Sequence, residues 1–332
     1  MNPQGFFLYF LLRTSDFLPP ISYLLLRASF RILPPRTFAM ITYNPKDWFT
    51  FIFRFHKADT LRQLSPLIIG ICVYCWVVAV LELHVFKLSD NSHVKQITVM
   101  HTLLSFVISM LLVFRTNTAY DRWWEGRKLW GALVNNSRNL AIKLHAMLGY
   151  EDASHRSFFK KIIPMFASVL SHHLHAESTR LALDEQEHPE LASLDTNRHL
   201  PNQVASLLFQ RVNRLYEEGK IKGDQLIVLN NELQSFTDIC GACERIKNTP
   251  IPFSYSVFLK KFIFFYVMTL PFSFVITLGY LAIPVVAFIF YVLASLELIA
   301  EEIEDPFGGD GNDLPMVKMA QNIKKHVGEI LS

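Results

Sequence analysis

Residues 105–130, SFVISMLLVFRTNTAYDRWWEGRKLW, begin as an apolar membrane-type helix and run into charged residues without a break. No proline or glycine occurs between Phe106 and Glu125, so nothing in the sequence ends the helix where the charges begin. Membrane helices usually end near such a boundary. We therefore predict a single helix that leaves the bilayer and keeps a polar face beyond it.

The rest of the chain has the composition of a membrane protein with a large aqueous part. Of its 332 residues 51% are hydrophobic, and 18% are charged against about a quarter in typical soluble proteins. Four apolar stretches reach the length that spans a bilayer. These predicted spans are residues 66–86, 98–115, 258–278 and 281–299, and only the stretch around Gly279 separates the last two, which predicts a tight hairpin.

The region between the second and third spans carries helical patterns. Apolar residues recur there every three to four positions, and one helix is predicted to begin at Pro201 and to stop at Gly219. No alternating strand pattern of convincing length occurs. We predict an all-α polytopic membrane protein whose main domain, residues 42–332, comprises the four spans, a cytosolic helical part (116–257) and a C-terminal segment (300–332).

The basic residues predict the orientation of the chain. Arg and Lys flank the outer ends of the first two spans (Arg54, Lys57, Arg62; Arg115, Arg122, Arg127, Lys128), whereas only Lys87 and Lys95 lie between these spans. The positive-inside rule then places both termini on the cytoplasmic or stromal side. Residues 1–41 are apolar but interrupted, and they form an N-terminal segment without an assigned role. A net charge of +3 without a basic run argues against nucleic acid as a partner.

One face of the long helix changes character along its length. Packing is the ordinary explanation for a Phe and Met stripe in a membrane helix. Here the same face becomes polar without a break, and Ser105 and Ser109 flank the apolar residues, which favours a helix that lines a water-filled path. The residues of this face are Thr102, Phe106, Met110, Phe114, Asn117 and Asp121.

Three motifs, in the same order, resemble the bestrophin family, in particular its bacterial and plastid branch: FRTNTAYDRWWEGRKLWG, TPIPFSYSVFLK and EEIEDPFGGDGNDLP. The stretch ITYNPKDWFTFIFRFHKADTLRQL also resembles the thylakoid voltage-dependent chloride channels of plastids. The resemblance implies a homopentameric ion channel with four membrane spans per subunit around one pore. It places the hydrophobic neck at Phe106, Met110 and Phe114, which the helical wheel also selects, and a cytosolic aperture at Ala205.

Chloride and similar anions are the expected permeant ions. The edges of the Phe106 and Phe114 rings carry positive partial charge and can face an anion. Arg115 and Arg122 are expected to pair with Asp121 or to offset its charge. Two alternatives stay open: a sodium channel of the same fold, and a membrane-bound metalloenzyme that uses the His and Asp clusters. No phosphate-binding loop, HExxH or GxSxG motif occurs, so we expect no catalysis. The bilayer would be a bacterial inner membrane or an organellar, thylakoid-like membrane.

Several side-chain groups have the residue types of metal sites. Two CxxC pairs, Cys72–Cys75 and Cys240–Cys243, are read as small buried residues because the first lies at membrane depth. The pair His172 and His175 is read as a solvated helix face. The C-terminal loop is not an EF-hand, because Met316 stands at the twelfth position. By resemblance to a calcium loop of animal bestrophins, the expected Ca²⁺ ligands are Asp305, Asp310 and Asp313, although Gly309 replaces an acidic residue; the alternative is a helix-ending turn at a subunit contact.

Overall fold

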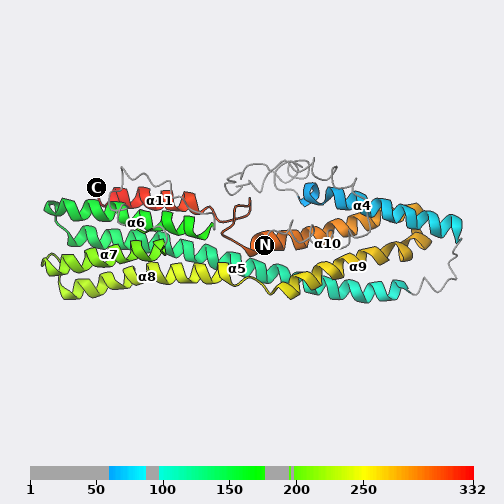
Figure 1. The fold of residues 1–332 in the computed structure, drawn as a ribbon, viewed down its shortest axis with the longest axis horizontal. Coiled ribbons are helices and arrows are strands. Elements are labelled where there is room, and N and C mark those ends of the chain that lie inside the picture. Colours follow the sequence, from blue (N-terminus) through cyan, green and yellow to red (C-terminus); the bar gives the residue numbers. More distant parts are fainter. Residues whose placement is uncertain (1–59, 87–96, 176–193, 196–197) are drawn as a thin grey trace. The chain divides into compact units, whose positions relative to one another are not determined.

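The computed structural model describes residues 60–86, 97–175, 194–195 and 198–332, which are helical with no strand among them (Figure 1). The predicted N-terminal segment 1–41 and the basic residues Arg54, Lys57, Lys87 and Lys95 lie outside the described residues.

Three described segments are long and apolar enough to cross a membrane, namely Thr60–Val85, Val99–Met147 and Phe253–Glu304. The first comprises α4 (Thr60–Val80) and the π-helical turn η3 (Leu81–Val85). The last contains α9 (Phe253–Leu278) and α10 (Ala282–Glu304), which are separated by the short 3₁₀ turn η7 (Gly279–Leu281). Gly279 has φ +57°, a conformation that glycine adopts without strain, and α10 packs back along α9. The predicted hairpin is confirmed.

The first membrane helix begins earlier than its sequence predicts. The span predicted from the sequence begins at Pro66, but α4 already begins at Thr60. Proline has no N–H to donate to the carbonyl of Arg62 four residues before it. The Ser65 hydroxyl donates to that carbonyl at 3.0 Å, which replaces the missing hydrogen bond and lets the helix pass through the proline.

The unbroken helix predicted from the sequence is α5, which spans Ile97–Met147. Its 51 residues make it about 75 Å long at 1.5 Å per residue. It contributes to two separate hydrophobic cores. Ile108 and Leu112 pack in a first core with residues of α9 and α10. Trp130, Leu133 and Leu140 belong to a second core. The stretch WGALVNN, which begins at Trp130, is part of α5.

The second core joins the aqueous half of α5 to four further helices: α6 (Ala153–Leu174), α7 (Leu200–Glu217), α8 (Gly223–Asn248) and α11 (Met316–Ile330). Pro201 lies in the first turn of α7, as predicted, and His199 is its N-cap. Gly219, with φ +70°, follows the last turn of α7. Both predicted boundaries of this helix are therefore confirmed.

The cysteines are free thiols. Cys75, Cys240 and Cys243 are buried, and the last two belong to the second core. Burial raises the pKa of both Cys240 and Cys243 to about 12, so these thiols stay protonated at neutral pH. They fill the core as small apolar side chains.

Candidate functional site

The residues of the face predicted to line a water-filled path, called the α5 stripe from here on, are all exposed in the subunit: Thr102, Phe106, Met110, Phe114, Asn117 and Asp121. The large apolar ones are among them, with exposures of 69% for Phe106, 50% for Met110 and 57% for Phe114. The opposite face of the same helix is buried: Ile108, Leu112, Arg115 and Ala119 are each at most 2% exposed. The subunit therefore presents the α5 stripe outward instead of packing it.

The exposed face continues beyond the predicted residues. Lys128 and Asn135 follow Asp121 at spacings of seven residues, which keeps them on the same side of the helix, and both are exposed. Within the described residues no ion pair involves Asp121. One face of α5 thus passes from apolar side chains to an amide, a carboxylate and then an ammonium group.

Arg115 does not offset Asp121, contrary to our prediction. Its side chain is 1% exposed and points to the opposite side of α5, where its Nη2 lies 2.7 Å from Oε2 of Glu304 and its Nε 3.5 Å from Oε2 of Glu297. The sequence placed Arg115 at the membrane edge, six residues before Asp121. A guanidinium group at that depth instead requires a carboxylate partner, and α10 supplies two.

Arg122 does not offset Asp121 either. Its guanidinium donates to backbone carbonyls of three residues, which lie at the end of α8, just after α8 and at the end of α10: Ile246, Thr249 and Glu304. The Glu304 carboxylate in turn accepts the backbone N–H of Ile251 at 2.7 Å. The two arginines therefore hold α5 against α10 and the α8–α9 connection at the point where α5 changes from one core to the other.

Three tryptophans of α5 differ in their surroundings. Trp130 is fully buried, and the indole N–H of Trp123 donates to the backbone carbonyl of Asn312 at 2.9 Å. Trp124 is 46% exposed and stacks on Tyr120, itself exposed, with ring centroids 6.5 Å apart. This exposed ring pair is available to a neighbour.

The C-terminal loop lies directly against α5. Its Phe307 is fully buried, and it approaches Gly126 so closely that a Cβ there would meet the ring at 3.1 Å. Only glycine allows this contact without displacement of the ring. The side chain of Asn312 donates to Glu302 of α10 at 2.8 Å. These contacts fix the loop to α5 and α10 within one subunit.

The three aspartates of the loop do not converge as preformed metal ligands in the subunit. The Asp305 carboxylate accepts the Phe307 N–H, and Asp313 accepts the Asp310 N–H. Asp313 Oδ1 is buried without a hydrogen-bond partner, and burial raises the pKa of this carboxyl to about 7. Among the described residues, the group close enough to share one ion lies elsewhere. An unpartnered buried carboxylate oxygen fits a cation, but the other two donors would have to come nearer or come from a neighbour.

A sequence model of the family described as "Bacterial/Fungal Bestrophin protein" matches residues 40–329. The chain belongs to the bestrophin family. A voltage-dependent anion channel-forming protein of Nostoc sp. is 32% identical over 88% of this chain and 94% of its own length. A protein with the same description from Synechocystis sp. is 34% identical over 68% of this chain and 75% of its own.

The fold of this bestrophin also matches solved structures. A mutant of a bacterial bestrophin homologue from Klebsiella pneumoniae superimposes with a TM-score of 0.71 and 26% identity, over 81% of this chain and all of that chain. Together with the apolar helical segments, these relatives identify an integral membrane protein.

Ala205, predicted to line a cytosolic aperture, lies in α7 and is only 3% exposed. Its side chain packs in the second core, so it does not reach a surface of the subunit. Val204 and Leu208 are buried beside it, whereas Asn202 and Ser206 are on the exposed side of α7. In the subunit, therefore, the exposed side chains of this helix turn are those of Asn202 and Ser206.

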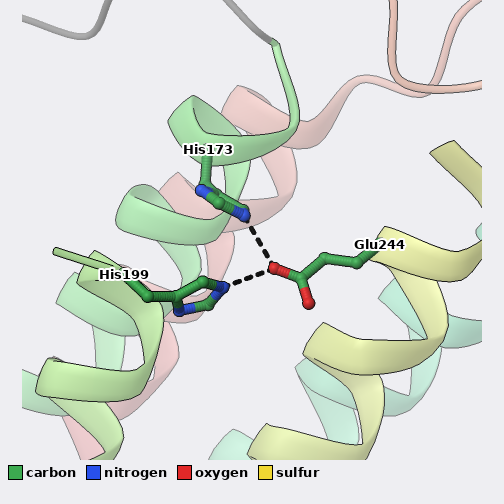
Figure 2. Close-up of side chains that lie close together, drawn as sticks. All are labelled: His173, His199 and Glu244. Atoms are coloured by element: carbon green, nitrogen blue, oxygen red, sulfur yellow. Dashed lines mark hydrogen bonds and ion pairs between the residues drawn. The ribbon is translucent and has the colours of Figure 1, made fainter. Parts of the chain in front are cut away.

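The histidines at the end of α6 differ in their surroundings, and one of them belongs to a cluster that the sequence did not predict. His172 is exposed, and His175 bonds to its own helix through the Ser171 carbonyl. Their neighbour His173 instead meets His199 and Glu244 (Figure 2). The three residues are separated by 26 and 45 positions in sequence, so only the packing of α6, α7 and α8 brings them together.

Proposed function

We propose that this bestrophin forms an oligomeric channel that conducts chloride and similar anions through a pore lined by the α5 stripe. The observation that carries the proposal is the exposure of Phe106, Met110 and Phe114 on an unbroken helix whose same face turns polar. Large apolar side chains that a subunit leaves exposed require a partner or a lipid surface. The descriptions of the relatives as anion channel-forming proteins support the pore.

One α5 stripe cannot enclose a path, so several subunits must bring their stripes together around an axis. We take the assembly to be a homopentamer, as the family resemblance implies. Each subunit would then contribute three apolar side chains to a narrow neck. Such a constriction can lose its water and close without a moving plug, and it can conduct when it is wide enough to be wet.

Anion preference would arise in this neck. The edges of aromatic rings are electropositive, so Phe106 and Phe114 can stabilise a partly dehydrated anion without a full positive charge that would trap it. The exposed Lys128 lies about 10 Å past Asp121 along α5 and would add a ring of positive charge to the vestibule.

A sodium channel of the same fold is the second candidate, and Asp121 is the observation that favours it. This carboxylate is exposed, and neither Arg115 nor Arg122 lies against it. An acidic ring usually favours cations. The two candidates differ in whether the channel prefers anions or cations, and a recording of the channel current determines this preference directly.

We further propose four membrane crossings, by α4, the first part of α5, α9 and α10, with both termini on the cytoplasmic or stromal side. The apolar length of these helices supports the crossings.

We also propose that the loop with Asp305, Asp310 and Asp313 holds neighbouring subunits together, with Ca²⁺ bound where a neighbour completes the ligands. The unpartnered Oδ1 of Asp313 supports this role.

Reconstitution of the purified protein in a planar bilayer tests the proposed function. A folded oligomer should produce discrete chloride currents in symmetric KCl, and potassium gluconate should carry much smaller ones because gluconate is too large for a narrow neck. The absence of conductance from a preparation with intact helix content and a single oligomer peak would contradict the proposal.

A further inference from the structure

His173, His199 and Glu244 come from three different elements of the second core. His173 lies in the last turn of α6, His199 is the N-cap of α7, and Glu244 lies near the end of α8. Both imidazole rings point toward the same carboxylate (Figure 2). Nε2 of His173 is 2.7 Å and Nε2 of His199 is 2.5 Å from Oε1 of Glu244. The donor atoms of all three residues lie within 4.8 Å of one another.

The chemistry of these donors selects one class of ion. Two imidazole nitrogens with one carboxylate form a ligand set that zinc uses in proteins, with an open fourth position for water. Calcium and magnesium prefer ligand sets made of oxygen and would leave the imidazoles unused. The three side chains are 27–35% exposed, so an ion and its remaining water can reach them from solvent.

We propose that His173, His199 and Glu244 form a binding site for a transition-metal ion of the zinc class, which ties the end of α6 and the start of α7 to α8. The site lies outside the α5 stripe, and it does not depend on the channel activity proposed above. It is proposed as a binding site only.

Binding would require the proton on the His199 ring to move from one nitrogen to the other. Without an ion, Nδ1 of His199 accepts the backbone N–H of Asn202 at 3.2 Å, so Nε2 carries the proton and donates to Glu244. An ion on Nε2 requires the proton to move to Nδ1, which breaks this N-cap hydrogen bond. The distances between the donor atoms must also widen to the spacing of ligands about 2.0–2.1 Å from one zinc ion. Metal binding and capping of α7 therefore compete for one ring.

The competition indicates which variants remove the ligands without disturbing the fold. Asn is a good N-cap, so His199→Asn keeps an acceptor for the first turn of α7 but removes the imidazole. Glu244→Gln and His173→Gln remove the other two ligands and keep hydrogen-bonding groups in place. His172→Gln serves as the matched control, because it removes an exposed imidazole from the adjacent position of α6.

Calorimetric titration of the full, untagged, chelator-treated protein with ZnCl₂ tests the proposal. One zinc ion per chain should bind, MgCl₂ and CaCl₂ should not compete, and His172→Gln should bind zinc like the unmodified protein. Each ligand variant should lower the affinity roughly 100-fold or more, because loss of even an outer-sphere partner typically costs 10–100-fold. X-ray absorption of the zinc-loaded protein should show two imidazole ligands at about 2.0–2.1 Å.

Two results would overturn the proposal. One is the absence of saturable zinc binding by the unmodified protein. The other is zinc binding that His173→Gln, His199→Asn and Glu244→Gln all leave unchanged, because the ion would then be held elsewhere. The X-ray absorption spectrum of the zinc-loaded, unmodified protein reports the ligands directly, so it tests the proposal even where one variant fails to fold.

Discussion

Phe106, Met110 and Phe114 illustrate how far single residues can be placed from sequence. Their spacing put them on one face of a helix, and the structure confirms that this face is exposed. The partners of a charged residue are harder to predict. Arg115 reads as a basic residue at the membrane edge, yet its carboxylate partners lie in α10, more than 180 residues away. Nothing in the neighbouring sequence indicates that pairing.

Simultaneous replacement of Phe106, Met110 and Phe114 by Ala should enlarge the single-channel current and shorten the closed periods. Smaller side chains widen the neck, which then stays wet. Three exposed phenylalanines of α9, Phe258, Phe264 and Phe265, provide a matched triple-Ala control of similar size and exposure. Planar-bilayer recordings that show unchanged currents in a folded neck variant would refute the assignment of the gate.

Asp121→Asn should change the conductance modestly and leave the preference for chloride over sodium intact. Asp121 lies seven residues past Phe114, about 10 Å beyond the neck. The Debye length at physiological ionic strength is about 8 Å, so water in a wide vestibule screens much of its field. Phe114→Ala should reduce the chloride preference more, and Phe265→Ala in α9 is its control. Loss of selectivity in Asp121→Asn alone would move the filter from the neck to the vestibule.

Helices that carry local signals were predicted better than those that depend on packing. The continuation of α5 beyond the charged boundary follows from the absence of proline and glycine between Phe106 and Glu125, the start of α7 from Pro201 and its end from Gly219. The burial of Ala205 in α7 was not predicted, because the direction in which an amphipathic helix buries its side chains depends on the neighbouring helices. The His173, His199 and Glu244 cluster could not be predicted for the same reason, since three helices contribute one residue each.

An ion pair links two of the turns that join the helices of the second core. Asp152, in the 3₁₀ turn η5 (Tyr150–Asp152) between α5 and α6, lies 2.6 Å from Nζ of Lys220, which follows α7. Asp152 also accepts the N–H of Gly149 at 3.2 Å. The hydrogen bond from Lys220 lowers the pKa of Asp152 below its ordinary value of 3.8. The charged form of this carboxyl is therefore favoured in the folded state.

Asp152→Asn should lower the melting temperature at pH 7, and the difference from the unmodified protein should shrink at pH 3. A carboxyl with a lowered pKa stabilises the fold fully above its unfolded pKa, and this stabilisation is lost as the pH falls through the folded pKa. Asp238→Asn, an exposed position of α8, should melt like the unmodified protein. Thermal unfolding in detergent at pH 7, 5 and 3 measures the effect; an equal difference at all three values would contradict this role for the charge.

The structure of a single chain says least about how subunits assemble. The subunit exposes the α5 stripe, the Tyr120 and Trp124 ring pair, and Asp305 and Asp310 of the acidic loop, and each of these surfaces is available to a neighbour. The sequence indicated a pentamer only through a family resemblance, because neither composition nor helical periodicity specifies the number of copies around an axis. Residues 1–41 received no role from the sequence and lie outside the described residues.

Replacement of Asp305, Asp310 and Asp313 together by Asn should shift the protein from its oligomer toward smaller species. The change removes three charges from a loop that we propose to contact a neighbour. Size-exclusion chromatography with light scattering measures the mass, and Asp224→Asn with Asp238→Asn in α8 controls for loss of charge alone. If calcium completes the contact, a chelator should weaken the oligomer of the unmodified protein only. An intact oligomer in the triple variant would contradict the proposed subunit contact, and the loop would then be only a helix-ending turn within the subunit.

The reversal potential of the purified channel in a gradient of NaCl tests the central claim most directly. A tenfold gradient separates the equilibrium potentials of chloride and sodium symmetrically about zero, so the sign alone identifies the permeant ion. The α5 stripe with its aromatic neck predicts a potential close to that of chloride, and Asp121→Asn should keep that sign. A potential close to that of sodium in the unmodified protein would contradict the account.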